Sequence, residues 1–463
     1  MDQERLKSKH GKSKFSPGGV CLSYSNQALK MLLLPLVIEQ VLVMLVGMVD
    51  TVMVASAGEA AVSGVALVDM VNYLIITVMA ALTTGGSVII SQYAGSRQPE
   101  QAERSAGQLM TVTLLLSAAI LAVCLLGRDA ILRLFFGSVE ADVMAAAQTY
   151  FMITACSFPF LGIYDAGAAL YRVMGKTTVT MYVSLTMNVI NVIGDFIGVS
   201  VLHAGVAGVA VPTLLSRAFA AVVMSLLAFR RQNSIPLYWH HILMWDTPVV
   251  RRILRIAVPN GLENGLFALG KVLVTSIVAG FGTVQIAANG VANSADQIAV
   301  IVVNAVNLAM VPVVGQCVGA SDYTQAAHYT EKLMRISYLF TAVLGLAVCV
   351  LLPVLLPLYG LSADTLRLAA LLIALHNALA LLLHPTSFNL ANSLRAAGDA
   401  RFTMIVGICS MIVFRLGSAL LFGNLLGLRI VGVWIAMGMD WLARSIAFSI
   451  RYKSGKWKEK RAI

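Results

Sequence analysis

Two stretches of similar sequence decide the fold: SQYAGSRQPEQA at residues 91–102 and GQCVGASDYTQA at residues 315–326. Gln92 of the first corresponds to Gln316 of the second, and a Gly and a Gln-Ala pair follow at the same spacing in both copies. Each copy closes a long apolar run with Gly and a group of polar residues. A signal that recurs at a fixed distance indicates a chain made of two related halves.

The same repeat extends along most of the chain. LPLVIEQ at residues 34–40 matches VPNGLEN at residues 258–264 in its Pro and Glu, at the same offset as the first pair of stretches. YRVMGKTTVTMYV at residues 171–183 matches LRAAGDARFTMIV at residues 394–406, where the offset shortens by a single position. Such a constant shift predicts an internal duplication, because biased composition alone would not keep the register.

Composition places both halves in a membrane. The chain is 59% hydrophobic and 12% charged, whereas soluble domains are about 45–50% apolar and about 25% charged. Residues 336–363 carry no charge, and a helix needs about 20 apolar residues to cross a bilayer. We expect twelve spans, near 30–54, 62–93, 107–127, 147–170, 179–200, 207–229, 253–280, 285–317, 334–357, 366–393, 402–424 and 430–450.

Six spans per half make the repeat parallel, with its pseudo-two-fold axis along the membrane normal. The predicted fold is an all-α polytopic protein with two pseudo-symmetric six-helix bundles in a V shape. Along the chain we expect a cytoplasmic N-terminal tail (1–25), an N-lobe (26–231), a cytoplasmic inter-lobe linker (232–249), a C-lobe (250–452) and a basic cytoplasmic tail (453–463).

The distribution of the 33 Lys and Arg residues orients the chain. Most of them fall in the tails and in every second loop, which the positive-inside rule assigns to the cytoplasm together with both termini. We expect no removable signal peptide, because no short apolar core with a cleavage site precedes the first span. The net charge of +11 is spread over these loops, so we expect no nucleic-acid partner.

Charged and polar residues inside the first half point to a coupling site. A charge at the bilayer centre costs about 2.5–3.5 kcal/mol, so each one marks a candidate pathway. Asp50 lies deep in the first span, and Asn188, Asn191 and Asp195 share one face of the fifth. Thr213 of the sixth span adds a hydroxyl. Their counterparts in the second half are mostly apolar: Val274 for Asp50, then Met411, Phe414 and Ser418 for the fifth-span residues.

Two carboxyl groups in one cavity disfavour double ionisation, so a proton or another cation should bind there. The alternative is that these polar side chains only form hydrogen bonds to neighbouring helices and serve packing. Four other ionisable residues within the spans could line a substrate cavity, with Lys271 neutralising an acid such as Asp296: Glu39, Glu263, Lys271 and Asp296.

Several function classes lack their motifs. The chain has no GxxxxGK[ST] loop for ATP, no HExxH and no compact nucleophile and base. We therefore expect no cofactor and an ion-driven transporter rather than an enzyme. Two alternatives stay open: a lipid-linked oligosaccharide flippase, which would want a strongly basic cavity, and a polytopic membrane enzyme acting on lipid.

The chain resembles the multidrug and toxic compound extrusion (MATE) family. The resemblance rests on VDT in the first span, QYAG at the end of the second, LYRVMGKT before the fifth, NxxNxxxD within it and GVAGVA opening the sixth. It implies a secondary active exporter that moves cationic or amphipathic organic compounds against protons or sodium ions by rocker-switch alternating access. It also implies a monomer among lipids in a bacterial or archaeal plasma membrane.

The resemblance carries over to named residues. Asp50, Asn191, Asp195 and Thr213 match the N-lobe cation and proton site of the DinF-like prokaryotic branch, so Na⁺ is a candidate ligand there. In the NorM-like branch an acid lies further along the seventh span than Glu263 does here. This departure favours coupling in the N-lobe.

Overall fold

The computed structural model describes residues 24–55, 58–137 and 139–463, so most of the predicted N-terminal tail lies outside the described residues. Within them, eleven helices are long and apolar enough to span a membrane, and a bent pair supplies a twelfth span. The spans are α1 (Asn26–Ala55), α2 (Glu59–Gly95), α3 (Pro99–Leu126), the pair α5 (Ala141–Cys156) and α6 (Phe158–Val173), α7 (Thr177–Phe196) with the π-helical turn η1 (Ile197–Val201), α8 (Ala207–Ala228), α10 (Thr247–Ala279), α11 (Thr283–Gly319), α12 (Tyr323–Leu355), α13 (Ala363–Ala396), α14 (Ala400–Cys409) with η3 (Ser410–Gly417) and η4 (Leu420–Leu425), and α15 (Arg429–Lys453). Short helices α4 (Arg128–Phe136), α9 (Trp239–Leu243), η2 (Leu356–Tyr359) and η5 (Lys456–Glu459) complete the order.

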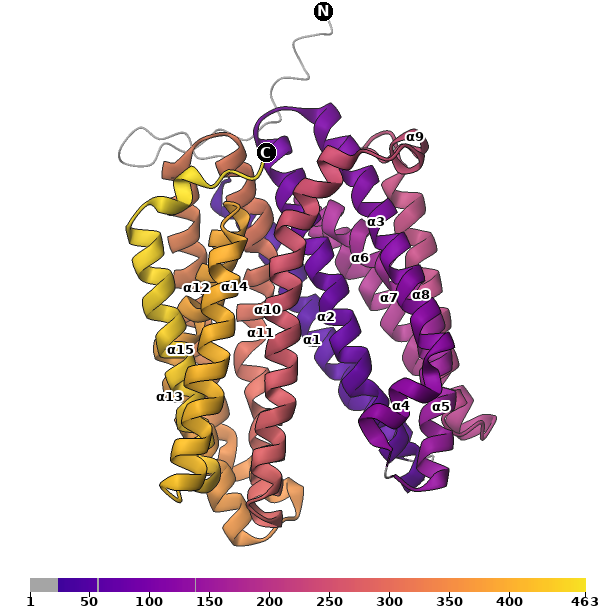
Figure 1. The fold of residues 1–463 in the computed structure, drawn as a ribbon, viewed down its shortest axis with the longest axis vertical. Coiled ribbons are helices and arrows are strands. Elements are labelled where there is room, and N and C mark those ends of the chain that lie inside the picture. The colour runs from indigo at the N-terminus through magenta and orange to yellow at the C-terminus, as the bar shows by residue number, and fades with distance from the viewer. Residues whose placement is uncertain (1–23, 56–57, 138) are drawn as a thin grey trace, which may run out of the picture.

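These helices form two lobes. In Figure 1, α1 to α8 make one lobe and α10 to α15 the other, and the two meet at the end of the molecule that holds the C-terminus. Toward the opposite end the lobes splay apart. The predicted V-shaped arrangement of two helical bundles is confirmed.

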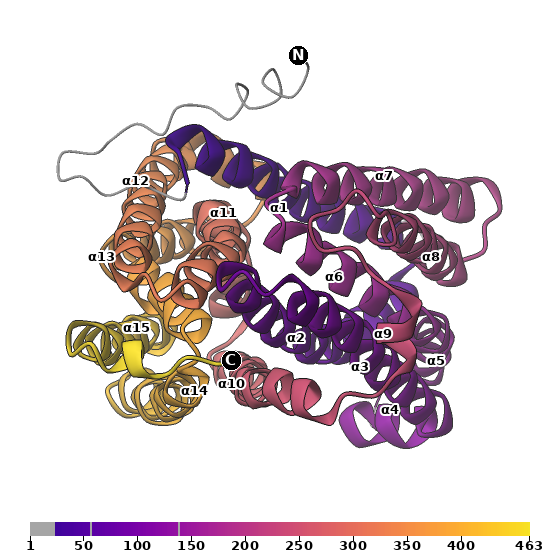
Figure 2. The ribbon, with the colours of Figure 1, turned by 90° about the horizontal axis from the view of Figure 1, so that it is seen from above.

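The first helix of each lobe crosses into the other lobe. Leu29, Leu32 and Leu36 of α1 pack in a core cluster with side chains from α11, α12 and α13. Val250 and Ile253 of α10 pack in the equivalent cluster with α2, α3 and α6. Figure 2 shows α1 running from the C-lobe side toward α7. The lobes therefore share their core at the joined end, where burial of apolar surface holds them together.

The fourth span is bent where α5 meets α6. The span is bent by 43° at the break between the two helices, and Pro159 lies in the first turn of α6. Proline has no backbone N–H and its ring clashes with the preceding turn, which breaks a continuous helix here. Ser157 lies at the bend, between α5 and α6, and is fully buried.

Close backbone contact joins the end of the fifth span to the start of the sixth. A Cβ atom on Gly198 would collide with the carbonyl oxygen of Gly208, so any side chain there would push η1 away from α8. The contact sets α7 beside α8 and brings their polar residues together.

Candidate functional site

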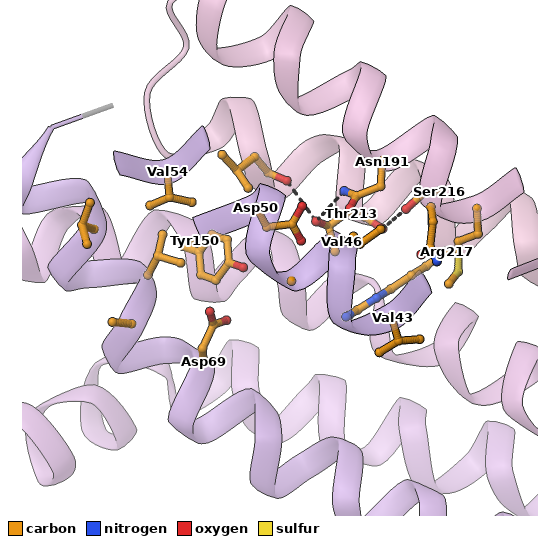
Figure 3. A pocket seen from close by; sticks show the side chains of 17 residues that line it. Val43, Val46, Asp50, Val54, Asp69, Tyr150, Asn191, Thr213, Ser216 and Arg217 are labelled. Atoms are coloured by element: carbon orange, nitrogen blue, oxygen red, sulfur yellow. Dashed lines mark hydrogen bonds between the residues drawn. The ribbon is translucent and has the colours of Figure 1, made fainter. Parts of the chain in front are cut away.

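A pocket of about 390 Å³ lies inside the N-lobe between α1, α2, α5, α7 and α8. Figure 3 shows Asp50 pointing into it opposite Asn191 and Thr213. These three residues and Asn188 line the pocket, so the structure brings together four of the five predicted coupling residues. The fifth, Asp195, is not a lining residue and is fully buried behind them.

A hydrogen-bond network connects these side chains. Asn191 Nδ2 donates to Asp195 Oδ1 at 3.4 Å and to Thr213 Oγ1 at 3.3 Å. The Thr213 hydroxyl donates to the Val209 carbonyl at 3.0 Å. The carboxyl groups of Asp50 and Asp195 are in side-chain contact. A first-span acid is thus linked to both the fifth and the sixth span.

The network has unused bonding capacity. Among the described residues, Asp50 Oδ1, Asp195 Oδ2 and Asn188 Nδ2 are buried without a hydrogen-bond partner. A buried polar atom left unpaired costs about 1–3 kcal/mol, and more if it is charged. A proton shared by the two carboxyl groups, or a cation between them, would remove this cost. The site is therefore chemically suited to take up positive charge.

Arg217 belongs to the pocket although it was not among the predicted site residues. Its Nη1 donates to Ser157 Oγ at 2.6 Å, so the bend of the fourth span fixes the guanidinium against the pocket wall. Arg217 follows Thr213 by one helical turn on the same face of α8. That spacing is the sequence signal that could have found it.

Asp69 of α2 and Tyr150 of α5 also line the pocket. Asp69 accepts a hydrogen bond from Asn72 Nδ2 at 3.4 Å, and the Tyr150 side chain contacts it. The pocket lining therefore holds two carboxyl groups, those of Asp50 and Asp69, with one guanidinium, and Asp195 adds a third carboxyl group behind it. If all are ionised, negative charge is in excess, which would attract protons, metal cations or organic cations.

The donor set limits which metal could bind. The described residues contain no group of three or more His, Cys, Asp or Glu side chains placed to hold a metal ion. A sodium ion between Asp50 and Asp195 would therefore also need the side-chain oxygens of Asn191 and Thr213. Carboxylate, amide and hydroxyl oxygens are the ligands that hard cations prefer.

The predicted cavity residues Glu39 and Glu263 form equivalent buried ion pairs instead of lining this pocket. Arg172 Nη2 lies 2.7 Å from Glu39 Oε1, and Arg395 Nη2 lies 2.6 Å from Glu263 Oε2. Glu39 and Glu263 are matched residues of the repeat, and so are the two arginines. The duplication therefore preserves one buried Glu–Arg ion pair in each lobe, and we call this pair the clasp of that lobe.

The fully buried Asp440 of the C-lobe also lies beside arginines, and the partly exposed Asp296 lies beside a histidine. Arg444 Nε lies 2.9 Å from Asp440 Oδ1, and Arg415 Nη1 lies 3.7 Å from Asp440 Oδ2. Asp296 Oδ1 lies 2.5 Å from His376 Nε2, so its close partner is His376 and not the expected Lys271. The Lys271 ammonium lies 5.4 Å from the centre of the Phe267 ring.

Paired glutamines close the joined end of the molecule. Gln92 Nε2 in the N-lobe donates to the Ala396 carbonyl in the C-lobe at 2.8 Å. Gln316 Nε2 in the C-lobe donates to the Val173 carbonyl in the N-lobe at 2.8 Å. The two bonds are related by the internal repeat. We call them the glutamine latch.

The family-model comparison identifies the chain. The MatE model matches residues 35–197 and again residues 259–421, and the two matches begin at Pro35 and Pro259, which are counterparts in the internal repeat. The chain belongs to the MatE family. This MatE-family chain is therefore a transporter of the multidrug type and not an enzyme, and the repeat predicted from the sequence coincides with two copies of the family's domain.

Curated relatives cover almost the whole chain. The uncharacterized transporter YisQ of Bacillus subtilis is 27% identical over 433 residues, which cover 92% of this chain and 94% of the relative. A probable multidrug resistance protein NorM of Thermotoga maritima is 24% identical over 442 residues, 93% of each chain. Placement of this MatE-family chain in the DinF-like branch stays a prediction.

Solved structures have the same fold. One titled as the outward-facing conformation of a multidrug resistance MATE family transporter has a TM-score of 0.87 at 20% identity, covering 93% of this chain and 96% of that one. Another, titled as MATE in the bent conformation, has a TM-score of 0.84 at 18% identity, covering 95% and 100%.

Proposed function

We propose that this chain is an antiporter that exports small organic, often cationic compounds against inward movement of protons or sodium ions. The observation that carries the proposal is the contact between Asp50 and Asp195, with one oxygen of each left without a partner among the described residues. Multidrug resistance names among the relatives support the substrate class.

Antiport follows if ion and substrate compete for the same carboxyl groups. A proton or sodium ion on Asp50 and Asp195 cancels the charge that would hold an organic cation in the pocket. Each ligand therefore lowers the affinity for the other, as reciprocal linkage requires. A monovalent cation that moves inward through 100 mV supplies about 2.3 kcal/mol for export.

The conformation fits one stage of this cycle. With both termini in the cytoplasm of a bacterial or archaeal cell, the splayed end of the monomer in Figure 1 would face outward. The glutamine latch would then be the closed inner gate. Similarity to a structure titled as outward-facing supports this orientation. Rocker-switch exchange would require the latch to break.

The flippase alternative is less consistent with the charges. A lipid-linked sugar carries phosphate and would favour a basic cavity. Here the pocket lining and Asp195 together provide three carboxyl groups for one guanidinium, Arg217, and Arg415 of the C-lobe lies beside Asp440. An acidic pocket suits organic cations better.

Ethidium efflux from proteoliposomes under separately imposed pH and sodium gradients tests the proposal. Efflux should respond to one gradient, and Asp50→Asn should lose that response. Asp129→Asn, an exposed carboxylate on the short helix α4, serves as the matched control and should transport like the wild type. Unchanged gradient-driven efflux in Asp50→Asn would contradict the proposal.

A further inference from the structure

A second pocket lies at the start of α10, far along the chain from the acidic site. It has a volume of about 350 Å³ and is lined by Thr247, Pro248, Arg251, Arg252 and Arg255. Figure 2 shows α10 at the edge of the molecule, next to the linker that carries α9. We call it the arginine pocket.

Its positive charges are not neutralised by the protein. Arg251 and Arg255 are exposed and lie one turn apart on α10, and no ion pair within the described chain involves them. Arg252 donates to the Tyr93 hydroxyl and its guanidinium lies 6.0 Å from the centre of that ring. Like charges one turn apart repel each other, so a bound anion would stabilise this turn.

The linker beside the arginine pocket presents apolar side chains to the outside. Trp239, Leu243, Met244 and Trp245 are 65%, 79%, 68% and 56% exposed. Tryptophan with neighbouring apolar residues is typical of the membrane interface, where rings lie at the level of the lipid headgroups. Trp245 precedes the pocket residue Thr247 by two positions, so the apolar segment leads directly into the arginine pocket along the chain.

Hydrogen bonds hold that linker in place. Gln108 Nε2 of α3 donates to the His241 and Met244 carbonyls at 2.7 and 2.6 Å. Thr111 Oγ1 donates to the Ile242 carbonyl at 2.7 Å. The apolar side chains are thus carried by a backbone that is fixed to α3, as a preformed binding surface needs to be.

We infer that the arginine pocket binds the phosphate headgroup of an anionic phospholipid. Guanidinium groups match phosphate oxygens with paired hydrogen bonds, and three of them line one cavity. A lipid is favoured over a soluble phosphate because its acyl chains would lie in the bilayer beside the exposed Met244 and Trp245. Cytoplasmic leaflets rich in anionic lipid concentrate such headgroups near basic residues.

A lipid at this position would act where the lobes are connected. The first turns of α10 carry both the arginines and Val250 and Ile253, which pack in the N-lobe core. A bound headgroup would hold the linker, this turn of α10 and the N-lobe together. The inference does not depend on which ion drives transport.

Thermal unfolding of the purified protein in detergent, with defined additions, tests the inference. The additions are phosphatidylglycerol, phosphatidylcholine and inorganic phosphate, each at equal concentration. The test variant is Arg251→Gln/Arg255→Gln. Its matched control, Arg230→Gln/Arg231→Gln, removes two charges at the end of α8, outside the pocket. Native mass spectrometry of the same samples counts retained phosphatidylglycerol.

Phosphatidylglycerol should raise the Tm of the wild type and the control by several degrees. The test variant should lose most of that Tm shift, and its mass spectrum should show one phosphatidylglycerol fewer. Phosphatidylcholine and phosphate should have little effect. An equal response of test and control variants would overturn the site, and a full response to inorganic phosphate would overturn the lipid as its occupant. If the double variant does not fold, Arg251→Gln alone takes its place. This single variant should lose part of the Tm shift that phosphatidylglycerol produces. An unreduced Tm shift would overturn the site.

Discussion

The two lobes descend from one duplicated unit, and each pairs one buried glutamate with an arginine, yet they differ in how their aspartates are partnered. In the C-lobe, Glu263, Asp440 and Asp296 each lie within 4 Å of an arginine or a histidine. In the N-lobe, Asp50 and Asp195 lie against each other. Under the proposed function, what the duplication preserved serves the scaffold, and what differs in the N-lobe serves ion binding.

The cost of buried charge explains why this difference matters. Removal of one partner from a buried pair leaves an uncompensated charge and is strongly destabilising, by about 3–5 kcal/mol. Two acids that lie against each other form no ion pair between them, so their contact does not stabilise the fold when both are ionised. In the proposed transport cycle, a mobile cation completes this site at one stage.

The largest effect should follow from neutralising the buried member of the acid pair. Asp195→Asn is expected to lower gradient-driven ethidium efflux at least tenfold, because an amide cannot bind a proton at neutral pH or balance a cation. The repeat counterpart of this residue is Ser418, and Ser418→Ala should transport nearly like the wild type. An equal loss of efflux in Asp195→Asn and Ser418→Ala would contradict the proposed difference between the lobes.

Breaking the C-lobe clasp should instead affect folding. Glu263→Gln leaves Arg395 without its acid, since that guanidinium lies 2.6 Å from Glu263. Arg444 loses a second acid at 3.8 Å but keeps Asp440 at 2.9 Å. We expect a loss of about 3–5 kcal/mol in stability, seen as a clearly lower Tm in detergent. Glu100→Gln, at an exposed ion pair, should change Tm little. Normal stability with lost ion coupling would mean that Glu263 belongs to the coupling site.

Disrupting the glutamine latch should have an intermediate effect, a change in the distance between the lobes. Gln92→Ala/Gln316→Ala removes two hydrogen bonds between the lobes, each contributing about 0.5–1.5 kcal/mol. Distances between spin labels on the two lobes at the joined end should shift toward longer values in the double variant. Gln98→Ala, at an exposed position just after the end of α2, should leave these distances unchanged. Unchanged distances in the double variant would show that the latch does not hold the lobes together.

The C-terminal tail should give the smallest effect. The Ala462 N–H donates to Gln92 Oε1 at 2.9 Å, and Arg461 Nη2 donates to the Gly319 carbonyl at 2.9 Å. Deletion of residues 461–463 should produce a weaker shift of the same spin-label distances than the latch variant. A larger shift in the spin-label distances than in the latch variant would mean that the tail, and not the glutamines, is the main contact that holds the lobes together at the joined end.

Much of this organisation could be predicted from the sequence. The constant offset predicted the duplication, and long apolar runs predicted the spans. The spacing of Asn188, Asn191 and Asp195 predicted a shared helical face, which the structure places at and behind the pocket. These signals are local, because they depend on helical periodicity or on comparison of the chain with itself.

The remaining features depend on how helices meet. Asp69 reaches the pocket because α2 packs beside it, which no periodicity reveals. The helical spacing from Thr213 pointed to the face of α8 that carries Arg217, but not to its hydrogen bond with Ser157 at the bend. Asp296 is close to His376 because α11 packs against α13, whereas sequence reasoning expected Lys271. The exchange of α1 and α10 between the lobes is likewise a property of packing.

Competition binding tests the N-lobe coupling site most directly. The Kd of ethidium would be measured across pH and sodium concentration for the wild type, Asp50→Asn and Asp296→Asn. The wild type and Asp296→Asn should show the same weakening of ethidium binding as the coupling ion increases, while Asp50→Asn should bind weakly and without ion dependence. Full ion dependence in Asp50→Asn, or its loss in Asp296→Asn, would place the coupling site outside the N-lobe pocket.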